Sequence, residues 1–259
     1  MNCKLCIYTV FHKPFFIPPH KYLQPVWVGN NKNLRQVNVP ADDSGDNISH
    51  LNEFFCELTV LYWVWKNKDM DENDYYGLCH YRRFFTDKGR PFSLSKFPLN
   101  RKASEKKMLY YVHASLDEII IKKLQNADVV LTYPVNVSLK RKVEISVYDQ
   151  YIQKHSKEEW EILQTVIKEK YPAYIPSFIL LSQQTKMCIG SMMIARSSVW
   201  NSYLEWVFDI LFEVHKRITY GNEIYQRRAT GFMAERLMNL YVQHNRLIIS
   251  YMHLVIFDK

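Results

Sequence analysis

Residues 74–85 read DYYGLCHYRRFF, an apolar run followed by a histidine, a tyrosine and two adjacent arginines. The run at 75–79 predicts a short buried strand. In α/β sheets, ligands bind beyond the carboxyl ends of strands, and guanidinium groups pair with phosphate oxygens through a rigid fork. Arg82 and Arg83 therefore predict a phosphate clamp, although a solvated arginine pair that caps a strand would have the same sequence.

The segments around this stretch alternate between strand and helix. Residues 5–10 predict an opening strand, which leads into His12 and a proline-rich polar loop. Residues 42–49, DDSGDNIS, predict an acidic turn-rich loop, and the apolar spacing over residues 51–65 predicts a helix capped by Asn47 or Ser49.

The remaining segments continue the alternation and become more helical toward the C-terminus. Residues 91–107 predict a basic loop, and residues 247–257 predict a strand or a membrane-surface element. The other predicted elements are a helix at 117–126, a strand at 128–133, a helix at 156–171, a strand at 187–195 interrupted by Gly190, and helices at 197–218 and 230–242. This order predicts an α/β fold with no clear linker.

The composition indicates a globular protein with an anionic partner. Hydrophobic residues make up 47% of the 259 residues and aromatic residues 15%, and the formal net charge is +8. That charge fits a nucleotide diphosphate, a nucleic acid or an acidic membrane surface. Basic residues gather modestly at 88–107 and at 140–142, without an RNA-binding signature.

Cysteines and apolar segments predict a reduced, non-spanning protein. Five cysteines without framework spacing favour a cytoplasmic setting. Cys3 and Cys6 form a CxxC, but in a strand their thiols would face opposite sides, so buried thiols are favoured over zinc. We expect no signal peptide and no membrane span.

Common catalytic motifs are missing from the sequence. It contains no Walker loop and no GxGxxG, HExxH or GxSxG motif. This argues against a P-loop enzyme, a Rossmann dehydrogenase, a zincin and an α/β-hydrolase. Folds that bind nucleotides without a glycine-rich loop remain.

Several motifs resemble a bacterial family of capsular polysaccharide and exopolysaccharide glycosyltransferases, which includes galactofuranosyltransferases and was long described as a domain of unknown function. The resemblance rests on DDSGDNIS (42–49), FCELTVLYWVWKN (55–67) and DYYGLCHYRRFF (74–85), in this order and spacing. It continues through SVYDQYIQKH (146–155), IKEKYPAY (167–174), SMMIARSSVWNSYLEWVFDILFEV (191–214) and GFMAERL (231–237). It therefore covers nearly the whole chain.

The resemblance implies a GT-A-like nucleotide-sugar-binding fold in a single domain over 1–259. Residues 1–135 or so would form the nucleotide-sugar half, and about 136–259 a more helical acceptor half. In GT-A enzymes an Asp-x-Asp motif after the central strand binds a metal; here His80-Tyr81-Arg82 resembles that position. The leaving diphosphate needs positive charge from a metal or from side chains. Transfer is thus expected either without a metal or with Mg²⁺ or Mn²⁺.

Candidate roles follow from the resemblance. For an inverting transfer, Glu235 is the first candidate for the base that takes the acceptor proton, with Asp46 and His80 in reserve. A solvated Glu235-Arg236 pair on a helix face is an equal alternative. The candidate donor-binding residues are His12, Asp43, Asp46, Asn47, Glu57, His80, Tyr81, Arg82, Arg83, Ser191 and Arg236, and the candidate metal ligands are Asp42, Asp43 and Asp46.

Other side chains carry weaker predictions. His155 is either a phosphate ligand or, more in keeping with its context, a satisfied surface histidine. Tyr81, Trp63 and Trp65 could stack on a base or sugar, although Trp65 lies on the apolar stripe and fits the core better. Ser191 stands where the family resemblance suggests asparagine, so substrate preference is expected to differ.

The expected function is transfer of a hexose, with galactofuranose as the first sugar to test, from a UDP-sugar to a lipid-linked glycan of a capsule, exopolysaccharide or O-antigen. The enzyme would be cytoplasmic and peripheral at the inner face of the membrane, where the basic loops would contact anionic lipid. The alternative is a non-catalytic basic module that binds nucleic acid or a polyanionic glycan. The acidic loop argues against that alternative, so no nucleic acid is expected.

Overall fold

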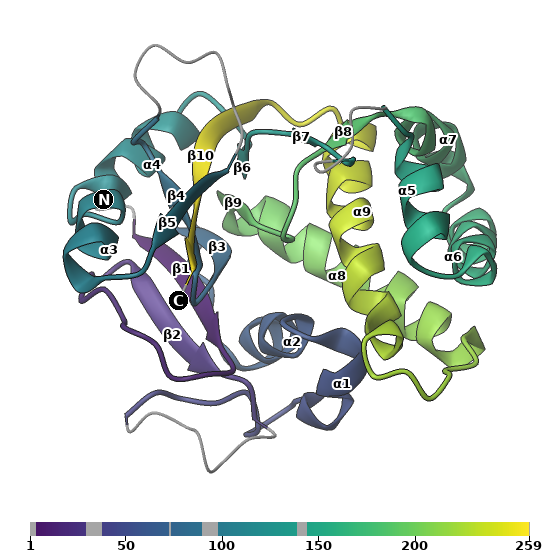
Figure 1. Cartoon of the computed structure of the whole chain (residues 1–259), viewed down its shortest axis with the longest axis horizontal. Coiled ribbons are helices and arrows are strands. Elements are labelled where there is room, and N and C mark those ends of the chain that lie inside the picture. The colour runs from purple at the N-terminus through teal and green to yellow at the C-terminus, as the bar shows by residue number, and fades with distance from the viewer. Residues whose placement is uncertain (1–3, 30–37, 73, 90–97, 139–143, 259) are drawn as a thin grey trace.

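A mixed sheet with helices on both faces organises the chain (Figure 1). The computed structural model describes residues 4–29, 38–72, 74–89, 98–138 and 144–258. Within these residues eight strands form the main sheet, in the order β2-β1-β3-β4-β10-β6-β9 with β5 beside β10. Their bounds are β1 Leu5–Phe11, β2 Leu23–Trp27, β3 Tyr75–His80, β4 Arg83–Thr86, β5 Leu99–Lys102, β6 Val129–Thr132, β9 Met193–Arg196 and β10 Ile249–Asp258. A small ribbon pairs β7 (Val135–Asn136) with β8 (Lys186–Met187).

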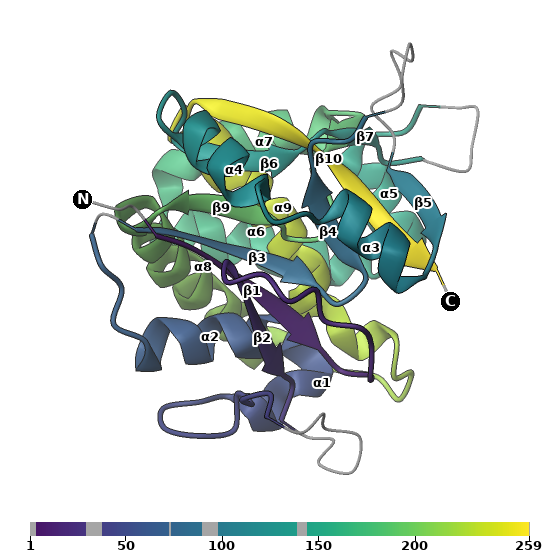
Figure 2. The ribbon, with the colours of Figure 1, turned by 90° about the vertical axis from the view of Figure 1, so that its left-hand side faces the viewer.

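The helices form one layer on one face of the sheet and two layers on the other. Short helices α3 (Glu105–Tyr111) and α4 (Leu116–Leu124) cover the first face. The second face is covered by α1 (Asn52–Phe55), α2 (Leu58–Asn67), α8 (Ser197–Arg217) and α9 (Ala229–His244). Beyond α8 and α9 lie α5 (Val147–Lys154), α6 (Lys157–Lys170) and α7 (Ile175–Gln183), as Figures 1 and 2 show. The fold is GT-A-like, as the sequence predicts.

Burial on both faces explains why the central strands are apolar throughout. Every residue of β1 is buried, and β3 is buried up to Cys79. Parallel strands covered by helices on both sides show this pattern, because no face remains for polar side chains. Gly77 in β3 has a steric role as well, since a Cβ atom there would lie 2.6 Å from Cγ1 of Ile194 in β9.

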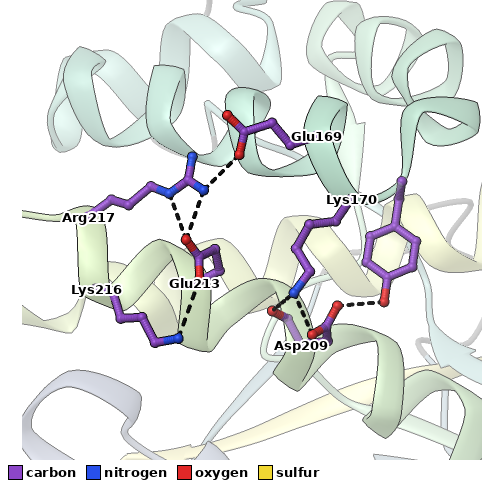
Figure 3. A network of polar contacts seen from close by, with 7 residues as sticks. Glu169, Lys170, Asp209, Glu213, Lys216 and Arg217 are labelled. Atoms are coloured by element: carbon purple, nitrogen blue, oxygen red, sulfur yellow. Dashed lines mark hydrogen bonds and ion pairs between the residues drawn. The ribbon is translucent and has the colours of Figure 1, made fainter.

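Ion pairs join the outer helix α6 to α8 (Figure 3). Arg217 of α8 contacts Glu169 at 2.7 Å and Glu213 at 2.8 Å. Lys170 of α6 contacts Asp209 at 2.6 Å. These pairs are partly exposed, so each adds little, and the buried apolar side chains between the helices contribute most of the stability.

The predicted helix at 51–65 is wrong as a single element. A 3-10 turn (Ser49–Leu51) leads into α1, which ends at Phe55. Cys56 follows with a φ of 51°, and α2 begins at Leu58. Nδ2 of Asn52 donates to the carbonyl oxygen of Cys56 at 2.7 Å, which stabilises the break. The apolar spacing hides it, because buried residues continue on the same side beyond the turn.

Two further expectations change, and one pair of alternatives is decided. Tyr81 and Arg82 form the turn of a β3–β4 hairpin, so Arg83 starts a new strand and pairs with His80. The predicted loop at 91–107 contains β5 and the start of α3 in its described part. For residues 247–257 the strand alternative is confirmed, because they contain most of β10, a central strand of the sheet. The main sheet contains strands from both sides of residue 135, since β9 and β10 pair within it.

Parts of the predicted basic loops, residues 90–97 and 139–143, and Cys3 lie outside the described residues. In the described part, no helix is both long and apolar enough to span a bilayer.

Candidate active site

The candidate site lies where β1 and β3 end. These strands are parallel neighbours, with Val10 in register with His80, and β2 lies on the other side of β1. The connection from β1 leads to β2 on one side, and the chain then returns to β3 on the other side of β1. The strand order reverses at this point, and α/β sheets bind ligands in the crevice formed there. His12 leaves β1 and His80 ends β3, so both histidines lie at this crevice.

Positive groups converge around His12. Partial burial of its ring, together with the nearby charges of Lys13, Arg228, His80 and Arg82, lowers the pKa of His12 to about 4. Although the residue as a whole is exposed, the ring stands edge-on to Tyr81, with centroids 4.7 Å apart. A neutral histidine among cations leaves the crevice ready for an anion.

The Tyr81-Arg82 turn presents its guanidinium beside this ring. The Cζ atom of Arg82 lies 5.2 Å from the ring centroid of Tyr81. Arg83 stands directly opposite His80 in the hairpin, and such cross-strand partners share one face of the sheet. His80, Arg82 and Arg83 therefore stay together at the end of β3.

Arg228 joins the cluster from the N-terminal side of α9, and the sequence alone did not predict this. Its Nε atom donates to Sγ of Cys56 at 2.9 Å. Burial raises the pKa of the Cys56 thiol to about 11, so it stays neutral. Burial alone would lower the pKa of Arg228. The contact with Cys56 and the negative charge of Glu57 have the larger combined effect, so the pKa of Arg228 is raised. Glu57 thus lies beside Arg228, at the edge of the crevice.

Glu235 faces the cluster from α9. Its Oε1 accepts the backbone N–H of Gly190 at 2.9 Å, and Nε2 of His80 donates to the carbonyl oxygen of Gly190 at 2.7 Å. Gly190 has a φ of 83°, a conformation that glycine adopts without strain. The next residue, Ser191, is buried with a φ of 51°, and its hydroxyl has no hydrogen-bond partner. Both residues lie at the crevice.

Arg236 is buried and holds Glu235 in place. It is 5% exposed and contacts Oε2 of Glu235 at 3.3 Å. Its other contacts are Oε1 of Gln150 at 2.6 Å and the face of Tyr151 at 5.3 Å. The arginine is therefore enclosed by protein groups and supports the site from behind, in contrast to its predicted donor contact.

The acidic loop is divided between the two ends of the sheet, since Asp42 and Asp43 lie against Gly29 just past the carboxyl end of β2. The buried carboxylate of Asp42 accepts from the backbone of Gly29 and the hydroxyl of Thr59, both at 2.5 Å, and Asp46 accepts from Tyr62 at 3.2 Å. Asn67 at the end of α2 also binds the backbone of Asp46. The next residue, Lys68, lines a cavity together with Lys4 and Asp74, which precede β1 and β3. Asp46 is thus placed at the other end of the sheet from His80.

The loop does not form a metal site by itself. Asn47 accepts from Ser49, but neither caps the helical turn as predicted, because Ile48 is at the N-cap position without a side-chain hydrogen bond. Asp43 flanks Gly29. Among the described residues, no group of three or more acidic, histidine or cysteine side chains could hold a metal ion. The predicted ligands Asp42, Asp43 and Asp46 are not gathered into such a group.

The remaining aromatic candidates take structural or peripheral positions. The indole of Trp63 donates to the carbonyl oxygen of Ser44, and Trp65 stacks on Phe208. Both pack in the core, as expected for Trp65. His155 stacks on Phe232 of α9 with centroids 4.0 Å apart.

A cavity of about 650 Å³ lies elsewhere, between the C-terminal half of α9, β8 and the start of β10. Its walls include Cys188 and Asn239. The side-chain amide of Asn239 accepts from the backbone N–H of Cys188 and donates to its carbonyl oxygen. None of the converging cations borders it, so it is not the candidate site.

The sheet, its reversal between β1 and β3 and the converging charges define an α/β protein with a GT-A-like fold. The chain belongs to the DUF4422 family, described as a domain of unknown function, whose model matches residues 6–246. It is also similar to the solved apo structure of the bifunctional glycosyltransferase WbbM, at 26% identity and a TM-score of 0.86 over 99% of this chain. The chain spans 46% of that protein's length. A comparison with curated proteins found no match.

Proposed function

We propose that this protein is a glycosyltransferase that moves a hexose from a UDP-sugar to a glycan acceptor. The observation that carries the proposal is the convergence of His12, Arg82 and Arg228 at the ends of β1 and β3, opposite the carboxylate of Glu235. The similarity to WbbM, a bifunctional glycosyltransferase, supports it.

In this proposal the cationic cluster binds the diphosphate. Arg82 and Arg228 approach from different elements, and Arg83 shares the His80 face of the hairpin. Charge placed in advance around a leaving diphosphate stabilises the transition state, because no reorganisation is needed as the bond breaks. The proposed chemistry uses these side chains and takes no step through a metal.

The proposed base is Glu235, for an inverting transfer. Gly190 and Arg236 each bind one of its oxygens, which fixes the orientation of the carboxylate. His80 is the second candidate, but its Nε2 already donates to Gly190, so only Nδ1 could accept a proton. Asp46, at the far end of the sheet, has no part in this chemistry.

The finer parts of the proposal rest on resemblance. UDP-galactofuranose is the first donor to test, and a lipid-linked capsular, exopolysaccharide or O-antigen glycan is the proposed acceptor. Such an acceptor would bring the protein to the inner face of the plasma membrane. The basic residues of the loops at 88–107 and 140–142 are the proposed lipid contacts.

Calorimetric titration with UDP tests the core of the proposal. We expect binding to wild-type protein, with and without Mn²⁺, and a loss of about tenfold or more in Arg82→Ala. The matched control is Arg196→Ala, because Arg196 pairs with Tyr75 at the opposite end of β3.

Equal UDP affinity in the Arg82→Ala and wild-type proteins would remove the clamp. Failure of wild-type protein to bind any nucleotide, with salt-dependent binding of oligonucleotides instead, would support the basic binding module.

A further inference from the structure

An exposed apolar pair lies directly beside the candidate site. Ile224 is 77% exposed and Tyr225 54% exposed, in the segment that leads into α9. Single exposed apolar residues are common on protein surfaces and need no explanation. This pair differs because the residues that follow it are fixed by contacts to three other parts of the fold.

Three successive residues anchor the segment. The side chain of Gln226 donates to the carbonyl oxygen of Lys154 at 3.0 Å, Arg227 pairs with Glu53 at 3.0 Å, and Arg228 binds Cys56. A segment held this firmly loses little conformational entropy when a ligand binds to it. Its exposed ring is therefore prepared for contact in advance.

Three rings pack against one another here, with Tyr225 exposed and Phe232 and His155 half-buried. The centroid of Phe232 lies 5.2 Å from that of Tyr225 and 4.0 Å from that of His155, and His155 and Tyr225 are 6.4 Å apart. The amide of Gln226 gives its N–H to Lys154, so its oxygen accepts from Nδ1 of His155 at 3.0 Å. In the neutral ring, Nε2 of His155 then carries only a lone pair, suited to a hydroxyl donor.

The ring surface meets the proposed donor site at Arg228. Its Cζ atom lies 5.9 Å from the centroid of Tyr225 and 5.8 Å from that of Phe232, while its charge also reaches His12. Phe232 precedes Glu235 by three residues on α9, so both side chains lie on neighbouring positions of one helix face. A group on the rings would therefore lie beside Arg228 and about one helical turn from the proposed base.

We propose that Tyr225, Phe232 and His155 form a stacking platform for one hexose ring of the acceptor glycan. This inference rests on the proposed function. A sugar ring combines an apolar C–H face with hydroxyls at its edge, and it matches flat rings that carry a phenol and an imidazole nitrogen. The pairing of an apolar face with hydrogen-bonding atoms favours a sugar over a purely apolar partner.

Saturation-transfer NMR tests the platform directly. The probes are methyl glucoside, methyl galactoside and methyl mannoside, each added to the full chain with saturating UDP. We expect at least one hexoside to receive saturation at its ring C–H protons, and Tyr225→Ala to weaken its binding about tenfold. Tyr225→Phe should retain binding, and the affinity for UDP should stay within twofold of wild type.

The matched control is Tyr110→Ala, because Tyr110 is 59% exposed on α3, across the sheet. If no hexoside binds, or if Tyr225→Ala binds as wild type does, the platform is overturned while UDP binding still supports the proposed function. Loss of UDP binding by wild-type protein would instead remove the proposed function. A further outcome would also overturn the inference. If wild-type protein and Tyr110→Ala adsorb to anionic lipid vesicles but Tyr225→Ala does not, the surface binds a membrane.

Discussion

His80 and Glu235 hold the two sides of one residue, Gly190, although they come from β3 and α9. The imidazole donates to the carbonyl oxygen of Gly190, and the N–H of Gly190 donates to the carboxylate. The end of the sheet and the helix layer are thereby joined through a single backbone position. Any shift of the Gly190 loop would move the proposed base relative to the proposed diphosphate cluster.

Replacement of Glu235 by glutamine should separate catalysis from donor binding. The amide keeps the size of the side chain but cannot take a proton, so transfer should fall about 10²- to 10⁴-fold. UDP affinity should be unchanged, as measured by calorimetry beside a transfer assay. Glu118→Gln, on an exposed position of α4, is the control. Transfer at the wild-type rate in Glu235→Gln would assign the base elsewhere, with His80 next.

Donor binding should take up protons near pH 5.5. Burial and the surrounding cations lower the pKa of His12 to about 4, so the free protein holds it neutral there. A bound diphosphate offsets those cations and raises the pKa, so affinity should increase as the pH falls from 7 toward 5. Titration with a UDP-hexose in two buffers of different ionisation enthalpy measures the uptake. His12→Asn should abolish it; uptake that persists in this variant would assign the proton to another group.

Arg236→Ala should destabilise the protein strongly. The arginine is 5% exposed and contacts Glu235 and Gln150, so its removal leaves buried polar groups without their partner. The expected loss is about 3 kcal/mol in the free energy of unfolding, from denaturant titration. Arg227→Ala, which removes a half-exposed pair with Glu53, should cost at most about 1 kcal/mol. Equal losses would show that Arg236 has no special structural role.

Gly77→Ala should also destabilise the fold, for a steric reason. A Cβ atom at residue 77 would lie 2.6 Å from Cγ1 of Ile194 and 3.0 Å from the carbonyl oxygen of Met193. Relief requires a shift of β3 against β9, with an expected cost of about 1–3 kcal/mol. At Gly221 an added Cβ meets nothing within 4 Å, so Gly221→Ala is the control. Thermal unfolding of both variants decides the point, and equal melting temperatures would contradict it.

Sequence reasoning succeeded where the signal was local and periodic. The strands at β1, β3 and β6 and the helices α4, α6, α8 and α9 were predicted from apolar spacing and capping residues. Ser156, for example, caps α6 by accepting from the backbone of Glu158. The GT-A-like fold followed from the resemblance.

Long-range contacts could not be predicted in this way. Arg228 and Cys56 meet only because the chain turns at Cys56, and no spacing signals a positive φ at a cysteine. The acidic loop misled for a related reason. Asp42 and Asp46 are close in sequence, but one is buried against Thr59 while the other is held at the end of α2. The short spacing of Asp42 and Asp46 in the sequence does not indicate that their side chains lie apart in the structure.

The central position of β10 has a consequence for synthesis on the ribosome. Residues 249–258 pair with β4, β5 and β6, all of which are translated more than a hundred residues earlier. Until β10 emerges, these strands expose unpaired edges, and open strand edges readily pair with other chains. The sheet can therefore close only late, after residues 249–258 have been synthesised, and the incomplete sheet is exposed to aggregation until then.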